Sequence, residues 1–188
     1  MPHFAFKTGL FNIGAAGQYT LGAYGALYCA IMLKLPWFVC LLVAAVLGGL
    51  WGAIPGFFKA YFNINEVITS IMFNWIGLYL VNELIYQNGT GPMYDVRNTR
   101  TLNLSKNADF AQSLIPDFGL NKLFQTNSTT IAIFLAAAVA VLIWVVLNKT
   151  TFGYELKAVG LNKNAARYAG INEKKNIILS MAIAGALA

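Results

Sequence analysis

Four uncharged polar side chains interrupt apolar stretches of the chain and could hydrogen-bond a passing solute. Asn12 and Gln18 carry amides, which both donate and accept, and they lie in a glycine-rich segment. Ser70 and Asn74 are four residues apart, which places them on one face of a helix. Polar groups inside a bilayer are costly unless they face partners or water. Two interpretations therefore stay open: hydrogen bonds between helices, or the lining of a solute path.

The chain offers little for covalent or metal chemistry. It contains one histidine, His3, and two cysteines, Cys29 and Cys40, which both lie in apolar runs. The sequence has no Ser–His pairing, paired aspartates or HExxH motif, so we expect no catalytic residue and no metal site. It also lacks a GxxxxGK(S/T) loop, which cradles ATP phosphates. The sequence thus predicts a protein that is not an enzyme and binds no cofactor of its own.

The composition favours a protein that lies in a membrane. Hydrophobic residues make up 58% of the 188 residues and charged residues only 11%, whereas soluble domains are about 25% charged. The net charge of +6 does not indicate nucleic-acid binding, because the basic residues flank apolar runs instead of forming a polar domain. A lipid bilayer, and no nucleic acid, is the expected surrounding.

Apolar runs predict an all-α fold, a polytopic transmembrane helical bundle. A membrane helix needs about 20 mostly apolar residues. A fifth run has 13 residues and would cover about 20 Å of the roughly 30 Å hydrocarbon core. We expect about four complete spans and a truncated fifth, in one incomplete membrane domain over residues 1–188. Pro55 should end the second span, and Asn65 should cap the third. The five runs are residues 13–33, 35–54, 66–86, 130–147 and 176–188.

Glycines mark two places where the spans are unusual. Gly9, Gly14 and Gly17 make a continuous helix costly, so the first span should be broken or start late. Gly48, Gly52 and Gly56 recur every four residues, which favours close packing against another helix.

Lysines and arginines indicate the orientation of the bundle. Residues 148–175 hold six of them and are placed in the cytoplasm, where basic residues concentrate. Alternation of the spans then makes residues 87–129 an extracytoplasmic loop, with eight basic residues inside and five outside. The expected location is the cell (plasma) membrane, which the chain crosses several times.

The basic segment contains a short predicted helix. Asn162 can cap a helix from Lys163 to Ala169, and Gly170 can end it. A helix of this length is not stable alone. It should therefore rest either on the membrane surface or in a groove of a cytoplasmic protein.

Three blocks of sequence resemble the permease subunits of bacterial ABC importers, in the binding-protein-dependent group for nucleosides, simple sugars and branched-chain amino acids. The blocks are residues 9–24 (GLFNIGAAGQYTLGAY), 63–76 (NINEVITSIMFNWI) and 150–171 (TTFGYELKAVGLNKNAARYAGI). The resemblance is strongest to the nucleoside and simple-sugar branch, whose members are much longer, so it implies a fragment. The third block corresponds to the coupling segment that contacts the ATPase. The implied coupling residues are Gly160, Asn162, Ala165, Ala166, Arg167, Tyr168 and Gly170.

The resemblance implies an ATP-driven importer. Nucleosides are its first expected solute, and ribose-type sugars are the second. Its implied partners are cytoplasmic ATPase subunits that bind ATP, a second permease subunit and an extracytoplasmic substrate-binding protein. Asn12, Gln18, Ser70 and Asn74 are the expected pathway residues. The competing class is a secondary transporter or channel that needs no ATPase. If the coupling assignment holds, Ala166→Asp should uncouple transport and leave membrane insertion intact.

Overall fold

The computed structural model describes residues 9–89, 91–95, 100–104, 108–116 and 130–188. Some predictions lie outside this part of the chain. They concern the opening segment and several basic residues that entered the orientation count, namely Lys7, Arg97, Lys106 and Lys122.

Helices dominate the described residues, and this confirms the predicted all-α fold. Short elements lie between the longer helices at one end of the bundle. The α-helices are α2 (Ala15–Ile31), α3 (Trp37–Phe62), α4 (Glu66–Tyr86), α6 (Ala132–Lys149), α7 (Thr151–Leu161), α8 (Lys163–Tyr168) and α9 (Glu173–Ala186). The short elements are η1 (Gln87–Gly89), β1 (Tyr94–Asp95), β2 (Arg100–Thr101) and η3 (Ala108–Ser113).

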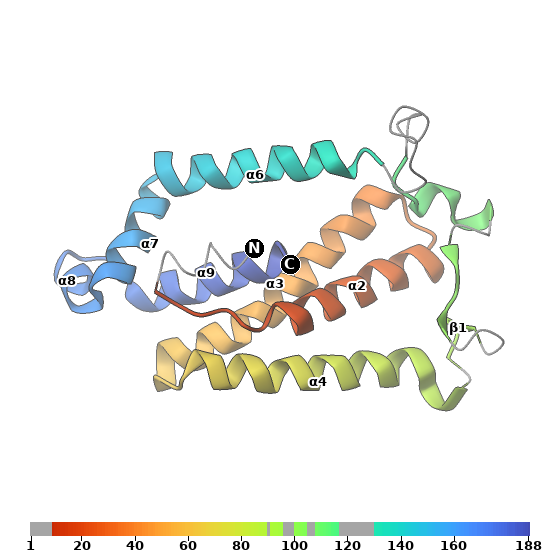
Figure 1. The fold of residues 1–188 in the computed structure, drawn as a ribbon, viewed down its shortest axis with the longest axis horizontal. Helices are drawn as coiled ribbons and strands as arrows, with labels where there is room; N and C mark the ends of the chain where they lie inside the picture. Colours follow the sequence, from red (N-terminus) through yellow and green to blue (C-terminus); the bar gives the residue numbers. More distant parts are fainter. Residues whose placement is uncertain (1–8, 90, 96–99, 105–107, 117–129) are drawn as a thin grey trace.

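The bundle has two distinct ends, which Figure 1 shows in one view. α4 and α6 lie on opposite sides, and α3 crosses between them in contact with α2, α4 and α9. α7 and α8 lie at the same end as the α3–α4 connection. β1 lies at the other end, near the α2–α3 connection. The predicted inner and outer segments therefore separate to opposite ends, as alternating spans require.

Three helices of the described chain are long and apolar enough to cross a membrane: α3, α4 and α6. α2 has 17 residues, which cover about 25 Å. The residues just before Ala15 are not helical, so the helix starts later than residue 13. It is therefore shorter than the complete span expected from residue 13. α9 begins at Glu173, where the Asn172 side chain accepts from Lys175 N, three residues before the predicted start.

The prediction that Pro55 ends the second span is wrong. α3 continues through Pro55 to Phe62, and it ends where Asn63 adopts a left-handed conformation with φ 51°. Proline removes one helical hydrogen bond, but helices in membranes tolerate it when neighbouring helices pack around it. Pro55 is buried, and the adjacent Gly56 lies against Met181 of α9. Packing with α9 therefore outweighs the local preference to stop.

The glycines of α3 allow α9 to approach its backbone. A Cβ atom added at Gly52 would lie 2.6 Å from the carbonyl oxygen of Met181, and one added at Gly48 would lie 2.5 Å from that of Gly185. Real side chains do not reach these distances without a shift of the helices. The expectation of close packing from the four-residue glycine spacing is therefore confirmed.

Gly52→Ala is expected to destabilise the protein by about 1–3 kcal/mol, because it overpacks the α3–α9 contact. The measurement is the apparent melting temperature of the purified protein in detergent. Val46→Ile is the matched control, since it also adds one methyl group to α3 but on a side chain that is 59% exposed. Equal shifts for the two variants would contradict the close contact.

The segment after α4 folds back over the end of the bundle where α2 connects to α3. β1 and β2 pair antiparallel, with Tyr94 opposite Thr101. In η3, the Ser113 hydroxyl donates to the carbonyl of Leu35 at 2.6 Å, and Asp109 lies 3.7 Å from Lys34. The predicted long loop thus has structure of its own that holds the α2–α3 connection.

Candidate functional site

The side chains of Asn12 and Gln18 pair with each other just before and inside the start of α2. Asn12 Nδ2 donates to Gln18 Oε1 at 3.0 Å, and Gln18 Nε2 donates to Asn12 Oδ1 at 3.2 Å. Asn12 Oδ1 also accepts from Gly14 N at 3.0 Å. Both side chains are almost fully buried. The amide pair therefore closes the extended residues that lead into α2 against its first turn.

Asn74 of α4 supplies the cap that α2 lacks in its own sequence. Gly14 occupies the N-cap position and has no side chain to offer. Instead, Asn74 Oδ1 accepts from Gly17 N at 2.8 Å, and Asn74 Nδ2 donates to Ile13 O at 2.9 Å. The first amides of a helix need such partners, above all away from water. The predicted late start of the first span is confirmed, and Asn74 is the residue that stabilises it.

Ser70 lies one turn before Asn74 and is completely buried. Its Cβ lies 3.4 Å from the position that a Cβ on Gly14 would occupy, so it faces the start of α2. Its Oγ has no hydrogen-bond partner among the described residues. A buried hydroxyl without a partner costs free energy. Asn74 therefore forms hydrogen bonds to the start of α2, whereas Ser70 Oγ forms none among the described residues.

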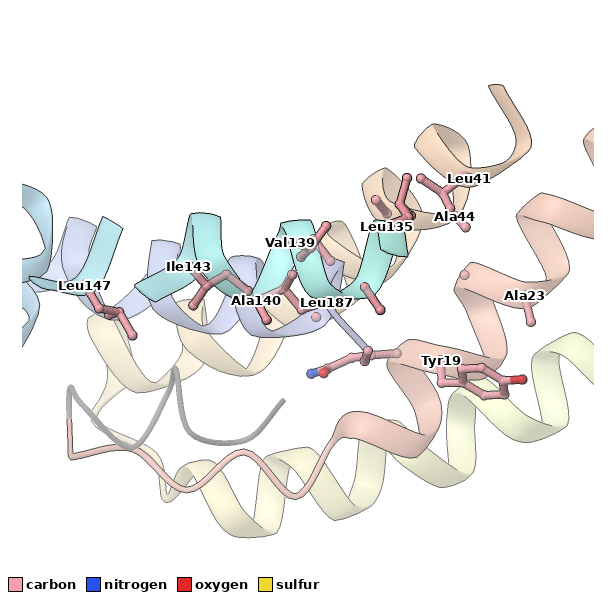
Figure 2. A pocket seen from close by; sticks show the side chains of 17 residues that line it. Tyr19, Ala23, Leu41, Ala44, Leu135, Val139, Ala140, Ile143, Leu147 and Leu187 are labelled. Atoms are coloured by element: carbon pink, nitrogen blue, oxygen red, sulfur yellow. The ribbon is translucent and has the colours of Figure 1, made fainter. Parts of the chain in front are cut away.

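An apolar cavity of about 780 Å³ lies beside this polar cluster, between α6 and the helices α2, α3 and α9. Figure 2 shows side chains of α6 on one side of it and Tyr19 and Ala23 of α2 on another. Gln18 also lines it, whereas Asn74 lines a smaller cavity of about 270 Å³ with Thr20 and Trp75. The four predicted pathway residues thus come together in space but do not share one cavity.

Sequence reasoning missed the part that α6 plays in this cavity. No residue of α6 is buried, and its main contact with the other helices is through α7. The available signal was a repeat of small and branched apolar residues every three or four positions. The residues of α6 that line the cavity are Leu135, Ala136, Val139, Ala140, Ile143 and Leu147.

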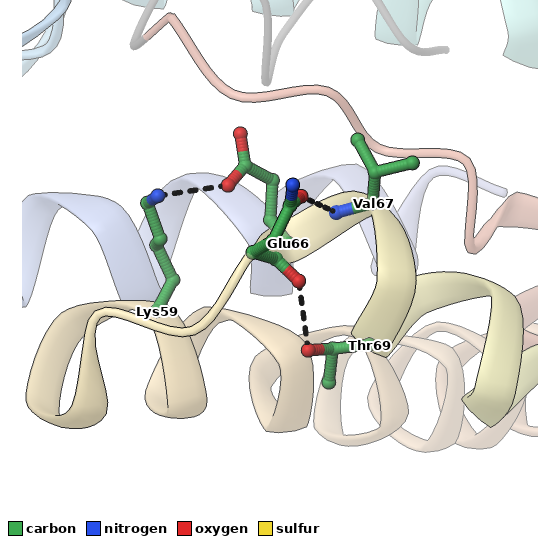
Figure 3. A network of polar contacts seen from close by, with 5 residues as sticks. Lys59, Glu66, Val67 and Thr69 are labelled. Carbon is green, nitrogen blue, oxygen red and sulfur yellow. Dashed lines mark hydrogen bonds and ion pairs between the residues drawn. The ribbon is translucent and has the colours of Figure 1, made fainter.

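The start of α4 carries an ion pair at the α7–α8 end of the bundle. Lys59 Nζ lies 2.9 Å from Glu66 Oε2, and the two side chains are only 17% and 15% exposed. Asn65 caps the helix by accepting from Val67 N at 2.9 Å, as predicted, and its carbonyl accepts from Thr69 (Figure 3). The negative charge of Glu66 therefore sits at the helix end where the dipole favours an acid.

The predicted short helix is confirmed as α8. The Asn162 side chain accepts from Asn164 N at 3.0 Å and from Ala165 N at 3.1 Å, and Gly170 has φ +81°. Before it, residues expected as polar loop form α7, which Thr150 caps by accepting from Gly153 N at 3.2 Å. The segment 148–175 is thus largely helical.

The two sides of α8 face different surroundings. Ala166 is 3% exposed and packs in a cluster with Leu10, Ile177 and Met181. Tyr168 is 94% exposed, and Leu161, which the sequence analysis did not single out, is 88% exposed. Ala166→Asp would therefore place a charge in the chain's own core, so we expect it to lower stability in addition to uncoupling transport.

The other residues predicted to take part in coupling are exposed at this end of the bundle. Asn162, Ala165, Arg167 and Gly170 are exposed, as is Gly160 at the end of α7. No group of three or more metal-binding side chains forms within the described ranges.

The chain was compared with known proteins. Residues 3–188 match the family described as branched-chain amino acid transport system, permease component. A guanosine ABC transporter permease of Bacillus subtilis is 37% identical over 98% of this chain and 51% of its own length. A nucleoside ABC transporter permease of Lactococcus lactis is 35% identical, with the same coverage. A glucose ABC transporter permease of Haloferax volcanii is 32% identical over 97% of this chain and 48% of its own length.

The chain thus spans about half the length of the relatives it matches. No solved structure matches it.

Proposed function

Because the chain belongs to the family of branched-chain amino acid transport permease components, and so is a multi-pass plasma-membrane permease of the ABC-importer type, we propose that it carries nucleosides. The proposed solute class rests on the match to permeases named for guanosine and for nucleosides, at 37% and 35% identity. A permease named for glucose is 32% identical, which makes a simple sugar such as ribose the second candidate.

The solute path that we propose passes the start of α2. A helix that begins inside the membrane presents its first backbone amides there, and such half-helix ends suit polar solutes. Asn12, Gln18 and Asn74 occupy this end with hydrogen bonds, and Ser70 adds an unused hydroxyl. Solute hydroxyls and ring nitrogens would compete for the same donors and acceptors. Opening of the amide pair is then the step that admits the solute.

The α7–α8 end is the proposed ATPase-docking surface, with residues 148–175 in the cytoplasm and residues 87–129 outside. An exposed leucine and an exposed tyrosine, flanked by the basic Arg167, suit a protein partner, because aromatic residues and arginine dominate binding surfaces. The ATPase subunits would bind ATP, and a second permease subunit and an extracytoplasmic binding protein would complete the importer.

A short physical route joins the docking end to the proposed path. Ala166 of α8 belongs to the same buried cluster as Leu10, and Leu10 precedes Asn12 by two residues. Gly9 lies against the end of α7, since a Cβ there would be 3.3 Å from the carbonyl of Gly160. Movement of α7 and α8 by the ATPase would therefore pull on the extended segment that carries Asn12. This route supports alternating access driven by ATP.

Uptake of labelled nucleoside tests the proposed function. Cells with the complete importer should accumulate guanosine with saturation, whereas cells without the permease or with an ATPase lacking its phosphate-binding lysine should not. Uptake of ribose in place of guanosine would favour the sugar alternative. Uptake that persists without a working ATPase would favour a secondary transporter or channel.

A further inference from the structure

A separate hollow of about 430 Å³, lined by both aromatic and polar side chains, lies at the end of α4 near the β1–β2 hairpin. Asn82 comes two turns after Asn74 on the same helix, about 12 Å further along it. The hollow is therefore separate from the cluster at the start of α2. Its volume falls within the roughly 300–1,000 Å³ that is usual for small-molecule sites. Its main lining side chains are Tyr79, Asn82, Glu83, Tyr86, Tyr94 and Arg100.

Aromatic faces dominate this hollow. Tyr86 of α4 and Tyr94 of β1 meet edge to face, with ring centroids 5.2 Å apart and an interplanar angle of 83°. Tyr79 stacks on Trp75 at 6.0 Å and is 66% exposed, so much of its surface is free to contact a ligand. Rings held in this way can stack on the planar face of a base.

Charged groups of both signs accompany the rings. Glu83 comes from α4 and Arg100 from β2, and both line the hollow. Neither forms a salt bridge within the described ranges. A guanidinium can donate twice to the O6 and N7 atoms of guanine, and a carboxylate accepts from ribose hydroxyls or ring N–H groups. Asn82 adds an amide that donates and accepts.

The hairpin that closes the hollow is anchored to the bundle. Leu102 N donates to Met93 O at 2.9 Å, next to the Tyr94–Thr101 pair. Met93 is 2% exposed and packs with Ile31 of α2 and Phe110 of η3. Tyrosines alone at this level would suit the aromatic belt of a membrane interface. Here the hairpin is held by buried side chains, and an arginine and a glutamate line the same hollow. This combination is instead typical of a ligand-binding site.

We infer that this hollow is an outer subsite of the permease that binds a nucleoside by stacking it on tyrosine and by hydrogen bonds to Arg100 and Glu83. The inference rests on the proposed nucleoside transport. It adds a site on the permease itself, upstream of the amide pair, where a nucleoside is held before the path opens.

The test is equilibrium binding of labelled guanosine to the complete permease–ATPase assembly in nanodiscs, without nucleotide and without the binding protein. Saturable binding is expected. Tyr86→Leu and Arg100→Gln should each weaken it about tenfold, whereas Tyr86→Phe should bind as the parent does, because it keeps the ring. Tyr28→Leu, a 42% exposed tyrosine of α2 that does not line the hollow, is the matched control. Elution as a single assembled species shows that each variant is folded.

Absence of saturable binding, or binding that Tyr86→Leu and Arg100→Gln leave unchanged, would overturn the subsite. Ribose that binds more tightly than guanosine, or guanosine displaced by added lipid headgroups, would overturn its nucleoside specificity. Uptake of guanosine in cells distinguishes a failure of the subsite from a failure of the proposed function. Normal uptake with no binding at this hollow removes only the subsite, whereas no uptake at all removes the proposed function.

Discussion

Asn74→Ala is expected to abolish transport and to lower the free energy of unfolding by about 1–3 kcal/mol, since two hydrogen bonds that hold the start of α2 are lost at once. The variant leaves Gly17 N and Ile13 O without the partners that now lie at 2.8 and 2.9 Å. The start of α2 should therefore lose its fixed position, together with the amide pair that depends on it.

Two measurements check this expectation: guanosine uptake by the complete importer, and the apparent melting temperature of the purified protein. Met72→Ala is the matched control, because it truncates a neighbouring side chain of α4 that is 58% exposed. It should leave both quantities near the parent values. A stable and transport-competent Asn74→Ala protein would show that α2 needs no cap from α4.

Helix ends were predictable from sequence where the capping residue is local. Asn162 before α8 and Asn65 before α4 each accept from an amide two residues on, and that signal is contained in a few adjacent letters. The glycines before α2 likewise predicted a late start. The residue that accepts the hydrogen bond from the first turn of α2 could not be predicted in the same way, because Asn74 is 57 residues from Gly17.

Packing decided what local preference could not. Pro55 reads as a stop in isolation, yet α3 continues because Gly52 and Gly56 lie against α9. The same limit applies to the sites. Spacing placed Ser70 and Asn74 on one face, but only the fold shows that Asn74 is bonded and that Ser70 Oγ has no partner among the described residues. The outer hollow depends on a hairpin register that no periodicity encodes.

Replacing Leu161 and Tyr168 together by alanine is expected to abolish ATP-driven uptake without changing the stability of the protein. The two side chains are 88% and 94% exposed, so they contribute little to the chain's own packing. Truncation of an aromatic hot spot that a partner covers costs about 2 kcal/mol or more, and the neighbouring leucine helps to exclude water from it. The double variant should therefore lose the ATPase on affinity purification. Leu33→Ala, a 54% exposed leucine at the opposite end, is the control and should keep the ATPase.

Ala166→Asp is the informative comparison for this docking surface. It would place a carboxylate beside Leu10 and Met181, where no cation of the cluster can pair with it. It should lower the melting temperature and also lose uptake, whereas the double variant should lose uptake at an unchanged melting temperature. The contrast distinguishes two roles of α8. Its buried face packs against the segment that leads to Asn12, and its exposed face is the proposed contact with the ATPase. If the double variant retained the ATPase and full uptake, the docking surface would have to lie elsewhere on the inner end of the bundle.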